Sequence, residues 1–424
     1  MITSFITGLI TIFWFYTVLI FRFFIFISIP IFYPAYIKIK AMVWEPILIP
    51  LIFPLLANIK WVERAKIIFS IGGSEFQFDN QVSISGNTAV IAVEEKSAPE
   101  SKFFRPIIYI YIRKENSWEL QTKLFVAGTQ VAINGNTIMV GQRFCVNEHQ
   151  RYFPIQIFTC SDDTWSLQTQ LTLPQPAKFN LSIKAIALKA DTAVFLTHGK
   201  VYVFRNQPDT NNWNQEAEFN AYGRTVAIDG NTIIVGGGKS AYVFVRNSAT
   251  NNWSQQAELS PMAEDDKSPN NVGIFGNTVV VGRPGIRNDR GAVDLYERDS
   301  ETGEWFQQNR FFPSEVPWNI AYGFGGSVAI DNNTIVIGAS RKHLICSDWV
   351  QLTKSETSAY IIERNSQTGK WSQPVKLLPK DHKQVARGYA REVRISGNRI
   401  IVTAPALSSN FGTDNIYIFE LVDS

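Results

Sequence analysis

The sequence predicts an all-β protein, a seven-bladed β-propeller whose blades have four strands each and whose ring is closed by an outer strand from the N-terminal side. Three observations favour this fold. A Gly-Asn-Thr turn signal recurs seven times along the chain, short aliphatic strands flank each copy, and seven tryptophan-led strands run one repeat out of step with these hairpins. Internal repetition of this kind is typical of propellers and related repeat architectures.

The turn signal predicts a tight hairpin in every repeat. Gly and Asn tolerate the positive φ that a two-residue hairpin turn needs, and the strands on either side of such a turn pair antiparallel. The signal reads Gly-Asn-Thr four times and is degenerate three times, and the seven copies span 86–88, 135–137, 190–192, 230–232, 276–278, 332–334 and 397–399.

The strand before each turn has two aliphatic residues around one that is usually small, as in Val226-Ala227-Ile228. Because side chains alternate along a strand, the aliphatic residues lie on one face and the small residue lies on the other. A face with so little room suits an innermost strand that converges with its equivalents on a central channel. The strand after the turn and an aromatic-rich third strand, such as 201–204, complete a meander.

A fourth strand led by tryptophan ends each of the first six repeats, and we assign these tryptophans to packing between blades. The seventh repeat stops at Ser424 after its third strand, whereas Trp61 precedes the first repeat with matching spacing. We therefore expect residues 59–70 to be the outer strand of the last blade, because a blade left open would expose an unpaired edge. The six tryptophans of the repeats are Trp118, Trp165, Trp213, Trp253, Trp305 and Trp371.

The propeller is thus expected to span 59–424, with an apolar N-terminal segment, 1–58, in front of it. Arg22 is the only charged residue of the first 36 positions, and residues 5–28 are long enough for a membrane helix, which takes about 20 apolar residues. We expect a membrane anchor here or, alternatively, an over-extended gene start with translation beginning at Met42. The expected location is membrane-associated, cell-surface or extracellular. Basic residues after the apolar run leave the cytoplasm as the alternative.

Two short motifs recur near the inner strands. Phe324-Gly325 stands at one inner strand and Gly338-Ala339-Ser340 follows its hairpin partner, and another repeat keeps Tyr222-Gly223 and Gly236. On these residues the repeat resembles the FG-GAP repeat of integrin α-chain propellers and, more closely, that of bacterial FG-GAP repeat proteins. The resemblance covers residues 61–424 and implies a propeller that binds a partner, as in cell adhesion. The Gly-Gly doublet of kelch repeats is only sporadic here, and the Trp-Asp pair of WD40 repeats is absent from the sequence.

The resemblance also implies calcium, which integrin-type blades hold in an Asp-x-Asp-x-Asp-Gly loop between their first two strands. This chain departs from that pattern, because the connection has shrunk to turns such as 229–232. One carboxylate in such a turn cannot supply the roughly six to eight oxygen ligands that calcium takes. We therefore expect no family-type calcium sites, no other metal site and no cofactor.

In a four-stranded meander the 1–2 and 3–4 turns lie on one face of the ring, and the 2–3 and 4–1 connections lie on the other, which we call the loop face. Binding residues concentrate in loops that a rigid scaffold carries. A basic arc in the longer connections could bind carboxylates or sulfates through bidentate hydrogen bonds. The alternative is that its members are ordinary solvated charges. The arc comprises Arg283, Arg287, Arg290, Arg341, Lys342, His343, Lys380, His382, Arg387 and Arg391.

A formal net charge of +3 is too small to indicate nucleic-acid binding through long-range electrostatics. The four histidines have no metal-ligand spacing, and the sequence has neither a nucleophile elbow nor a phosphate-binding glycine loop. We therefore expect a monomeric, non-enzymatic interaction module that presents its loop face to a protein or glycan partner. The alternative is a carbohydrate-active enzyme, a glycan hydrolase or lyase, with an acidic pair near the channel mouth.

Overall fold

The computed structural model describes residues 61–69, 76–96, 104–142, 154–174, 182–207, 209–210, 212–260, 271–313, 322–340, 357–381, 388–405 and 414–422. The chain divides into two compact units, Met1–Lys60 and Trp61–Ser424, and every described residue belongs to the second. The expected anchor, 5–28, therefore lies outside the described residues. In the part of the chain that is described, no helix is long and apolar enough to cross a membrane.

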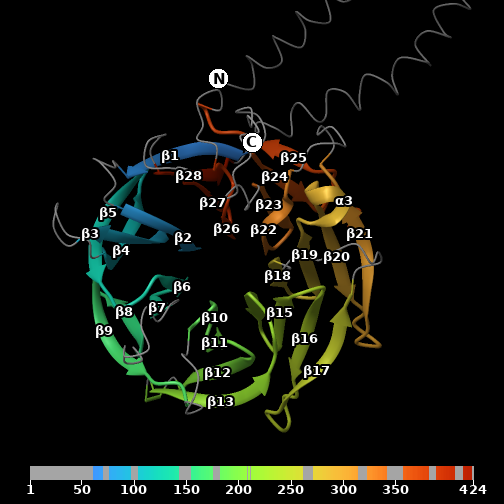
Figure 1. Cartoon of the computed structure of the whole chain (residues 1–424), viewed down its shortest axis with the longest axis horizontal. Helices are drawn as coiled ribbons and strands as arrows, with labels where there is room; N and C mark the ends of the chain where they lie inside the picture. Colours follow the sequence, from blue (N-terminus) through green and yellow to red (C-terminus); the bar gives the residue numbers. More distant parts are fainter. Residues whose placement is uncertain are drawn as a thin grey trace, which may run out of the picture. The chain divides into compact units, whose positions relative to one another are not determined.

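Seven four-stranded antiparallel sheets stand in a ring, as the sequence predicts (Figure 1). Each sheet is one blade, and in six of the seven blades the strands follow one another outward from the centre in chain order. Blades one to four comprise β2 (Phe76–Ser85), β3 (Thr88–Lys96), β4 (Phe104–Lys114) and β5 (Ser117–Phe125); β6 (Gln130–Asn134), β7 (Thr137–Gly141), β8 (Ile155–Ser161) and β9 (Thr164–Leu171); β10 (Ala185–Lys189), β11 (Thr192–Leu196), β12 (Lys200–Gln207) and β13 (Asn212–Asn220); and β14 (Thr225–Asp229), β15 (Thr232–Gly237), β16 (Ser240–Arg246) and β17 (Trp253–Leu259).

Blades five to seven repeat this order, and one short helix, α3 (Ile286–Asp289), lies between the second and third strands of blade five. The strands are β18 (Asn271–Phe275), β19 (Thr278–Arg283), β20 (Ala292–Arg298) and β21 (Trp305–Phe311); β22 (Phe324–Asp331), β23 (Thr334–Ala339), β24 (Ser358–Glu363) and β25 (Val375–Leu377); and β26 (Val393–Ser396), β27 (Arg399–Ala404) and β28 (Asp414–Leu421), with β1 (Trp61–Phe69) as the outer strand of blade seven.

The N-terminal strand closes the last blade. β1 pairs antiparallel with β28, with Trp61 opposite Leu421 at one end and Phe69 opposite Asp414 at the other. Figure 1 shows the two strands side by side, although they come from opposite ends of the propeller sequence. The closing strand predicted from the displaced tryptophan is thus confirmed.

Two side chains of β1 also bind the chain segment that leads into blade seven. A carboxylate oxygen of Glu63 accepts a hydrogen bond from the backbone N–H of Lys380 at 2.7 Å. Lys66 Nζ lies 2.5 Å from Asp381 Oδ2. The closing strand is therefore held both by its ladder with β28 and by polar contacts with residues 380–381.

The 1–2 turns have the predicted backbone conformation. In all seven described turns the first turn residue has a φ between +49° and +57°. This includes Ala190 and Asn332, which replace glycine in the degenerate copies. The turn geometry therefore holds even where the residue is not the one that adopts it most easily.

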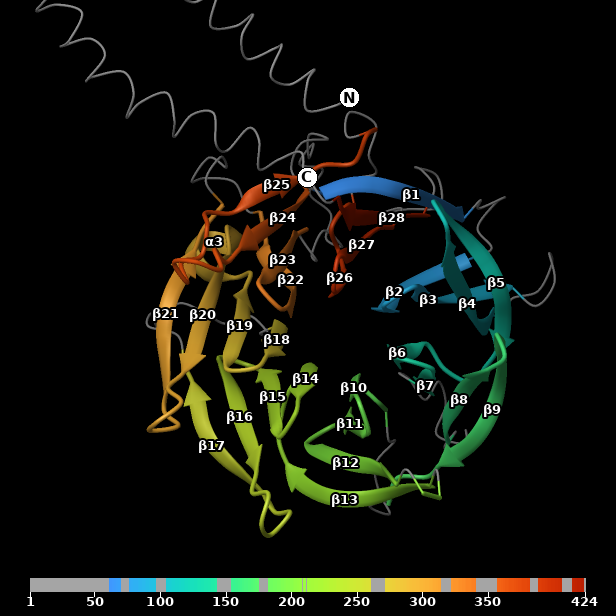
Figure 2. The same ribbon diagram turned by 180° about the vertical axis from the view of Figure 1, so that it is seen from behind.

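The first strand of each blade borders the central opening, whether the ring is seen from the front or from behind (Figure 2). Packing between blades follows the predicted alternation. At the contact of blades three and four, Ala185 and Ala187 lie in one apolar cluster with Val226 and Ile228 of the next blade. The small side chains let neighbouring blades approach where the strands converge on the channel.

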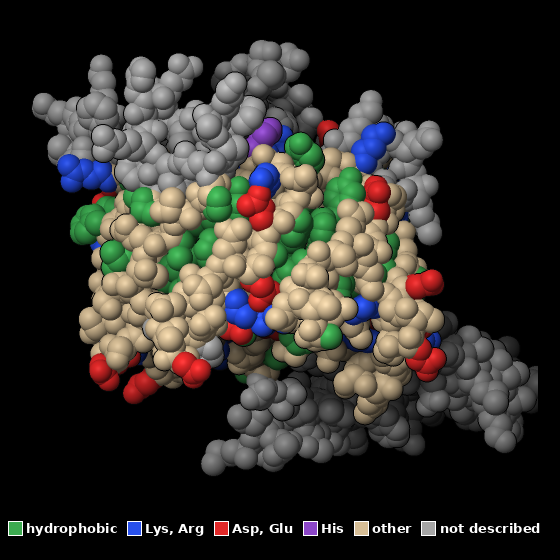
Figure 3. Space-filling model, turned by 90° about the horizontal axis from the view of Figure 1, so that it is seen from below, with side chains coloured by type: hydrophobic (Ala, Val, Ile, Leu, Met, Phe, Trp, Pro, Cys, Tyr) green, Lys and Arg blue, Asp and Glu red, His purple; other side chains and the backbone are tan. Residues whose placement is uncertain are grey.

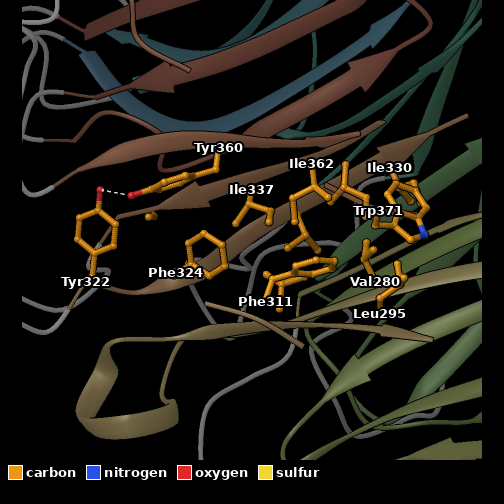
Figure 4. Close-up of a cluster of buried hydrophobic side chains, with 14 residues drawn as sticks. Val280, Leu295, Phe311, Tyr322, Phe324, Ile330, Ile337, Tyr360, Ile362 and Trp371 are labelled. Carbon is orange, nitrogen blue, oxygen red and sulfur yellow. Dashed lines mark hydrogen bonds between the residues drawn. The ribbon is translucent and has the colours of Figure 1, made fainter. Parts of the chain in front are cut away.

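Farther from the channel, large aromatic side chains fill the space between blades, as Figure 4 shows for blades five and six. Leu295 and Phe311 of blade five pack in one cluster with Phe324 and Tyr360 of blade six. The rings of Phe324 and Tyr360 meet edge to face with their centroids 5.2 Å apart. The Tyr360 hydroxyl also bonds to that of Tyr322 at 3.1 Å, which satisfies two buried polar groups inside the cluster.

The outer tryptophans link each blade to the one before it, which confirms their assignment to packing between blades. In three blades the indole Nε1 donates to the side chain that stands three residues after the tryptophan of the preceding blade, whereas the Nε1 atoms of Trp213 and Trp371 have no hydrogen-bond partner among the described residues. The donor and acceptor pairs are Trp165 with Gln121 (3.1 Å), Trp253 with Glu216 (2.9 Å) and Trp305 with Gln256 (3.0 Å).

The contacts around the closing strand use a different acceptor. Arg64 and Pro374 stand three residues after Trp61 and Trp371, and neither side chain can accept this hydrogen bond. Carboxylates of the third strands replace them. Glu420 accepts from Trp118 at 3.3 Å, and Glu363 accepts from Trp61 at 3.2 Å.

Blade six has a shorter outer strand than the sequence predicts. Trp371 forms only an isolated bridge with Arg364, and the strand itself is limited to Val375–Leu377. Pro374 separates the two, and proline has no N–H to offer a strand ladder. The tryptophan therefore precedes the outer strand of this blade instead of opening it.

A second set of bonds joins the 1–2 turns around the ring. At five contacts between described turns, the last side chain of an inner strand accepts a hydrogen bond from the turn backbone of the next blade. The acceptor and donor residues are Ser85 and Gly135 (2.9 Å), Asn134 and Ala190 (2.8 Å), Asp229 and Gly276 (2.6 Å), Asp331 and Gly397 (2.6 Å), and Ser396 and Gly86 (3.0 Å). The aspartates of these turns thus connect blades, and the bonds stabilise the face opposite the loop face.

The outer wall of the ring is seen from the side in Figure 3. On this side hydrophobic side chains form separate patches between polar surface. Leu120 of β5 and Leu167 of β9 are examples of exposed apolar residues, each two positions after the tryptophan of its strand. The wall seen in this view is therefore not a continuous apolar surface.

Candidate functional site

The central channel holds a cavity of about 550 Å³ that reaches the loop face, and residues of all seven blades line it. The inner strands begin at this face, so the residues at and just before their first positions surround the opening, which we call the channel mouth. Ligand pockets commonly have volumes of about 300–1,000 Å³. The channel mouth is therefore a recess of suitable size that the scaffold itself provides.

Two cations without a counter-charge border the channel mouth. Lys184 immediately precedes β10 and Arg224 immediately precedes β14, and both line the cavity. Within the described residues, neither side chain has a hydrogen-bond or ion-pair partner. Burial and the neighbouring charge of Arg224 lower the pKa of Lys184, as desolvation and a nearby like charge do. The two side chains are available to bind an anion.

The backbone holds both cations in place. The N–H of Lys184 bonds to the carbonyl of Leu196 at 2.8 Å, and the N–H of Arg224 bonds to the carbonyl of Gly236 at 2.8 Å. Each bond extends the inner hairpin of its blade by one residue. The two side chains therefore start from rigid positions in adjacent blades, although they lie outside the strands.

Gln130 adds an unused hydrogen-bond donor to the lining. Its side chain is only 2% exposed, it lines the cavity, and its buried Nε2 has no hydrogen-bond partner among the described residues. A buried polar group without a partner costs about 1–3 kcal/mol. The hydroxyl of Thr225 and the amide of Asn271 belong to the same lining. The channel mouth thus has neutral polar groups in its lining as well as Lys184 and Arg224.

The inner strand of blade seven brings a charged pair into the channel. Arg394 occupies the position that is small in most other blades, and it forms an ion pair with Glu392, which immediately precedes the strand. Arg394 also donates to the carbonyl of Val393 at 2.9 Å. The Glu392 carboxylate is therefore engaged by an arginine. Within the described part of the chain, no group of three His, Cys, Asp or Glu side chains could hold a metal ion.

Tyr222 presents an exposed aromatic ring near Arg224, although it is not itself one of the residues that line the cavity. Its side chain is 71% exposed, and it stands two residues before Arg224, so the two Cα atoms lie within about 7 Å of each other. The ring lies over the 2–3 turn of blade three, where a Cβ atom added to Gly199 would be 3.1 Å from it. Gly199 also has a φ of +91°, a conformation that favours glycine. The ring is supported from below while most of its surface faces solvent.

Arg283 does not belong to the loop face, and its placement in the basic arc is wrong. The side chain is fully buried and forms an ion pair with Asp294 inside blade five. It also donates to the carbonyls of Lys239 (3.0 Å) and Leu259 (3.2 Å) and approaches the hydroxyl of Tyr296 at 3.2 Å. The reason is that β19 continues one residue past Gly282, so Arg283 pairs with Ala292 as part of the sheet.

Two other members of the arc lie in or beside the short helix α3. Arg287 is exposed, and its guanidinium stands 4.1 Å from the centre of the Phe312 ring. Arg290 donates a hydrogen bond to the carbonyl of Pro313 at 3.2 Å. Both arginines are therefore engaged with the chain that follows blade five.

The remaining described members of the arc are Lys380 and Arg391. Lys380 is exposed, and Arg391 lines the cavity near the start of β26. Arg391 is thus the member that the structure brings to the channel mouth, among those it describes. The other five lie outside the described residues, and they are Arg341, Lys342, His343, His382 and Arg387.

Reasoning from the sequence missed Lys184, Arg224, Gln130 and Tyr222. It looked for binding residues in the long connections, whereas these residues lie in or beside inner strands or in short connections. One signal could have found two of them. The residue directly before an inner strand necessarily stands where all seven strands converge, and that position holds Lys184 and Arg224 in neighbouring repeats.

Neither a protein-family model nor a curated protein matches the chain. Solved structures that it resembles weakly include a protein from Lactobacillus plantarum (TM-score 0.47, 13% identity, covering 70% of this chain and 83% of that one) and Sqt1 from Saccharomyces cerevisiae (TM-score 0.46, 8% identity, covering 85% and 100%). A functionally unknown protein from Desulfotomaculum acetoxidans DSM 771 has a TM-score of 0.43 and 11% identity, covering 72% and 87%. The fold follows from the sheet topology itself, which is that of a seven-bladed β-propeller closed by its N-terminal strand.

Proposed function

We propose that this protein is a non-enzymatic binding module of the FG-GAP type, which presents its loop face to a protein or glycan partner. The observation that carries the proposal is the pair of cations, Lys184 and Arg224, that lines the channel mouth and has no hydrogen-bond or ion-pair partner among the described residues. Lys184 is half-buried and Arg224 is exposed, and burial together with the like charge of Arg224 disfavours the charged form of Lys184. Such an arrangement is typical of a site whose partner comes from outside the chain.

The glycines of the recurring motifs support the FG-GAP assignment on physical grounds. A Cβ atom on Gly223 would lie 2.7 Å from the carbonyl oxygen of Gly236, and one on Gly338 of blade six would lie 2.3 Å from the carbonyl oxygen of Ala390. The connection into blade four therefore lies directly on the end of that blade's second strand. Glycine at both motifs is what permits such close approaches.

The carboxylates of the cavity favour binding over turnover. A glycan hydrolase generally needs two carboxyl groups on opposite sides of the scissile bond, one of which can donate a proton. Glu392 and Asp289 both line the cavity, but Glu392 is paired with Arg394, which favours its ionised form. This pairing supports a binding role for the lining.

The proposal is tested by applying the full-length protein to a glycan array and, in parallel, measuring the release of reducing ends from every glycan that binds. We expect binding without release. Release of reducing sugar at a rate above that of a heat-denatured control would contradict the non-enzymatic function and support the hydrolase alternative.

A further inference from the structure

We infer that the ligand of the channel mouth is an acidic saccharide, whose anionic group binds Lys184 and Arg224 and whose ring stacks on Tyr222. The inference rests on the proposed binding function and narrows its ligand to one chemical class. The anionic group is a carboxylate or a sulfate, both of which suit the planar donors of arginine and the point charge of lysine.

The anionic part of the ligand follows from the two cations. Lys184 and Arg224 come from adjacent blades, line the same cavity and have no partner within the described residues. An anion between them would replace a repulsive contact with two attractive ones. It would also compensate for the burial that disfavours the charged form of Lys184.

The neutral polar side chains of the cavity wall indicate that the ligand carries hydroxyl groups. Gln130 Nε2 is buried in the cavity wall and has no partner in the described part of the chain, so it can donate a hydrogen bond to a ligand oxygen. Thr225 and Asn271 stand at the equivalent inner-strand position of blades four and five. Sugar hydroxyls both donate and accept, and therefore suit a wall of amides and hydroxyls.

The exposed aromatic side chain of Tyr222 indicates that the ligand contains a ring that can stack on it. Its exposed aromatic face combines a large apolar area with few degrees of freedom, and Gly199 beneath it leaves room for the ring to lie against the turn. A pyranose ring has an apolar C–H face and a polar edge. It can cover Tyr222 while its substituents reach Arg224, which is two residues away.

The shape of the site favours a saccharide over a peptide. Peptides are commonly bound along a free sheet edge or in an apolar groove, whereas this cavity combines charges with amides. The 2–3 connections of blades three and four are tight turns, such as the one closed by the bond from Thr197 N–H to the carbonyl of Lys200 at 2.9 Å. The 2–3 connections on either side of Tyr222 are therefore short. An acidic peptide that uses the cations alone is the competing outcome.

The test measures binding to the full-length protein by calorimetry, with probes that differ only in charge. Trigalacturonic acid is compared with its methyl ester, and a sulfated galactan oligosaccharide with its desulfated form. An oligoglutamate peptide is the third arm. We expect one of the two anionic saccharides to bind at least about tenfold more tightly than its neutral form, as a charge-assisted hydrogen bond to arginine predicts.

Matched variants assign the effect to residues. Lys184→Gln combined with Arg224→Gln should abolish the preference for the anionic form, and Tyr222→Ala should weaken binding of both forms, with Tyr222→Phe restoring it. Lys239→Gln is the control, because Lys239 is an exposed cation in a turn of the same face that does not line the cavity. The thermal unfolding midpoint of the double variant should not fall, since the two side chains have no partners among the described residues.

Three results would overturn the inference. They are equal binding of the anionic and neutral saccharides, a preference that persists in the double variant, and tighter binding of oligoglutamate than of any saccharide. Release of reducing ends from a bound saccharide would instead overturn the non-enzymatic function and leave the ligand class in place.

Discussion

Arg113 and Glu420 form a bidentate ion pair across the contact between blade one and blade seven. Arg113 Nε lies 2.5 Å from Glu420 Oε1, and Arg113 Nη2 lies 3.0 Å from Oε2. Glu420 is only 4% exposed and also accepts from the Trp118 indole at 3.3 Å. Arg64 of the closing strand and Arg399 approach the same carboxylate at 3.8 and 3.5 Å. One buried side chain thus gathers contacts from the strands on both sides of the point where the ring closes.

Replacing Glu420 should lower stability strongly. Glu420→Gln keeps the size of the side chain but leaves Arg113 and its neighbours without a counter-charge, and breaking a buried ion pair costs about 3–5 kcal/mol. Urea denaturation measures the change in the free energy of unfolding. The control is Glu119→Gln, which removes the exposed pair of Lys114 and Glu119 and should cost about 0–1 kcal/mol. Equal effects of the two variants would show that Glu420 does not hold the contact.

The same residue predicts a dependence of stability on pH. Burial raises the pKa of Glu420, but the hydrogen bond and charge of Arg113, with the charge of Arg399 and the Trp118 bond, outweigh burial and leave the pKa below its ordinary value. A depressed carboxyl pKa contributes stability that is complete above the unfolded-state pKa of about 4.3 and is lost as pH falls through the folded-state value. The difference in urea midpoint between the wild type and Glu420→Gln should therefore shrink over the range from about pH 5 downward. A difference that stays constant over this range would contradict the assignment.

The closing strand offers two neighbouring isoleucines with opposite environments. Ile67 of β1 is 8% exposed and packs in the apolar cluster between blades seven and one, whereas Ile68 is 52% exposed. Ile67→Asp should cost several kcal/mol, roughly 3 or more, because it buries a charge without a partner, and it should promote aggregation of the opened ring. Ile68→Asp should leave stability nearly unchanged. Thermal unfolding with light scattering checks both variants, and similar midpoints would contradict a closing role for β1.

Replacing Arg283 and replacing Asp294, which form a buried ion pair, should lower stability by different amounts. Asp294 accepts hydrogen bonds from Arg310 and Gln307 as well as from Arg283. Arg283→Met therefore leaves Asp294 with a second cation, whereas Asp294→Leu leaves fully buried Arg283 without an anion. The second change should cost about 3–5 kcal/mol and the first clearly less, as measured by chemical denaturation. The reverse order would show that Arg310 does not compensate for the charge of Asp294.

The architecture could be predicted from the sequence because its signals are local and repeated. The turn at 230–232 and the alternation in Val226-Ala227-Ile228 each act within a few residues, and seven aligned copies remove the ambiguity of any single one. The displaced Trp61 then implied the closing strand. Even the outer hydrogen bonds follow a spacing rule, since Glu216 stands three residues after Trp213 and accepts from Trp253.

The site was predicted less well, because it depends on where each strand ends. One additional residue in β19 moved Arg283 from the loop face into a buried ion pair. Binding residues were expected in the long connections of the loop face, whereas Lys184 and Arg224, which have no partner among the described residues, stand directly before the inner strands of two blades with short 2–3 connections. The repeat pattern is the same whether a strand ends one residue earlier or later and whatever residue precedes it. The pattern alone therefore could not reveal the site.

By itself, the sequence determined that this protein has seven blades, tight 1–2 turns and an N-terminal strand in its last blade, because turn chemistry and alternation operate over short distances along the chain. Only the tertiary structure decided that Arg113 meets Glu420, 307 positions away, and that Lys184 and Arg224 face one cavity. The physical reason is ring closure. Closure brings distant segments into contact, and the geometry of each contact depends on the packing of all seven blades. The burial and ion pairing of residues at these contacts therefore cannot be read from the spacing of residues along the chain.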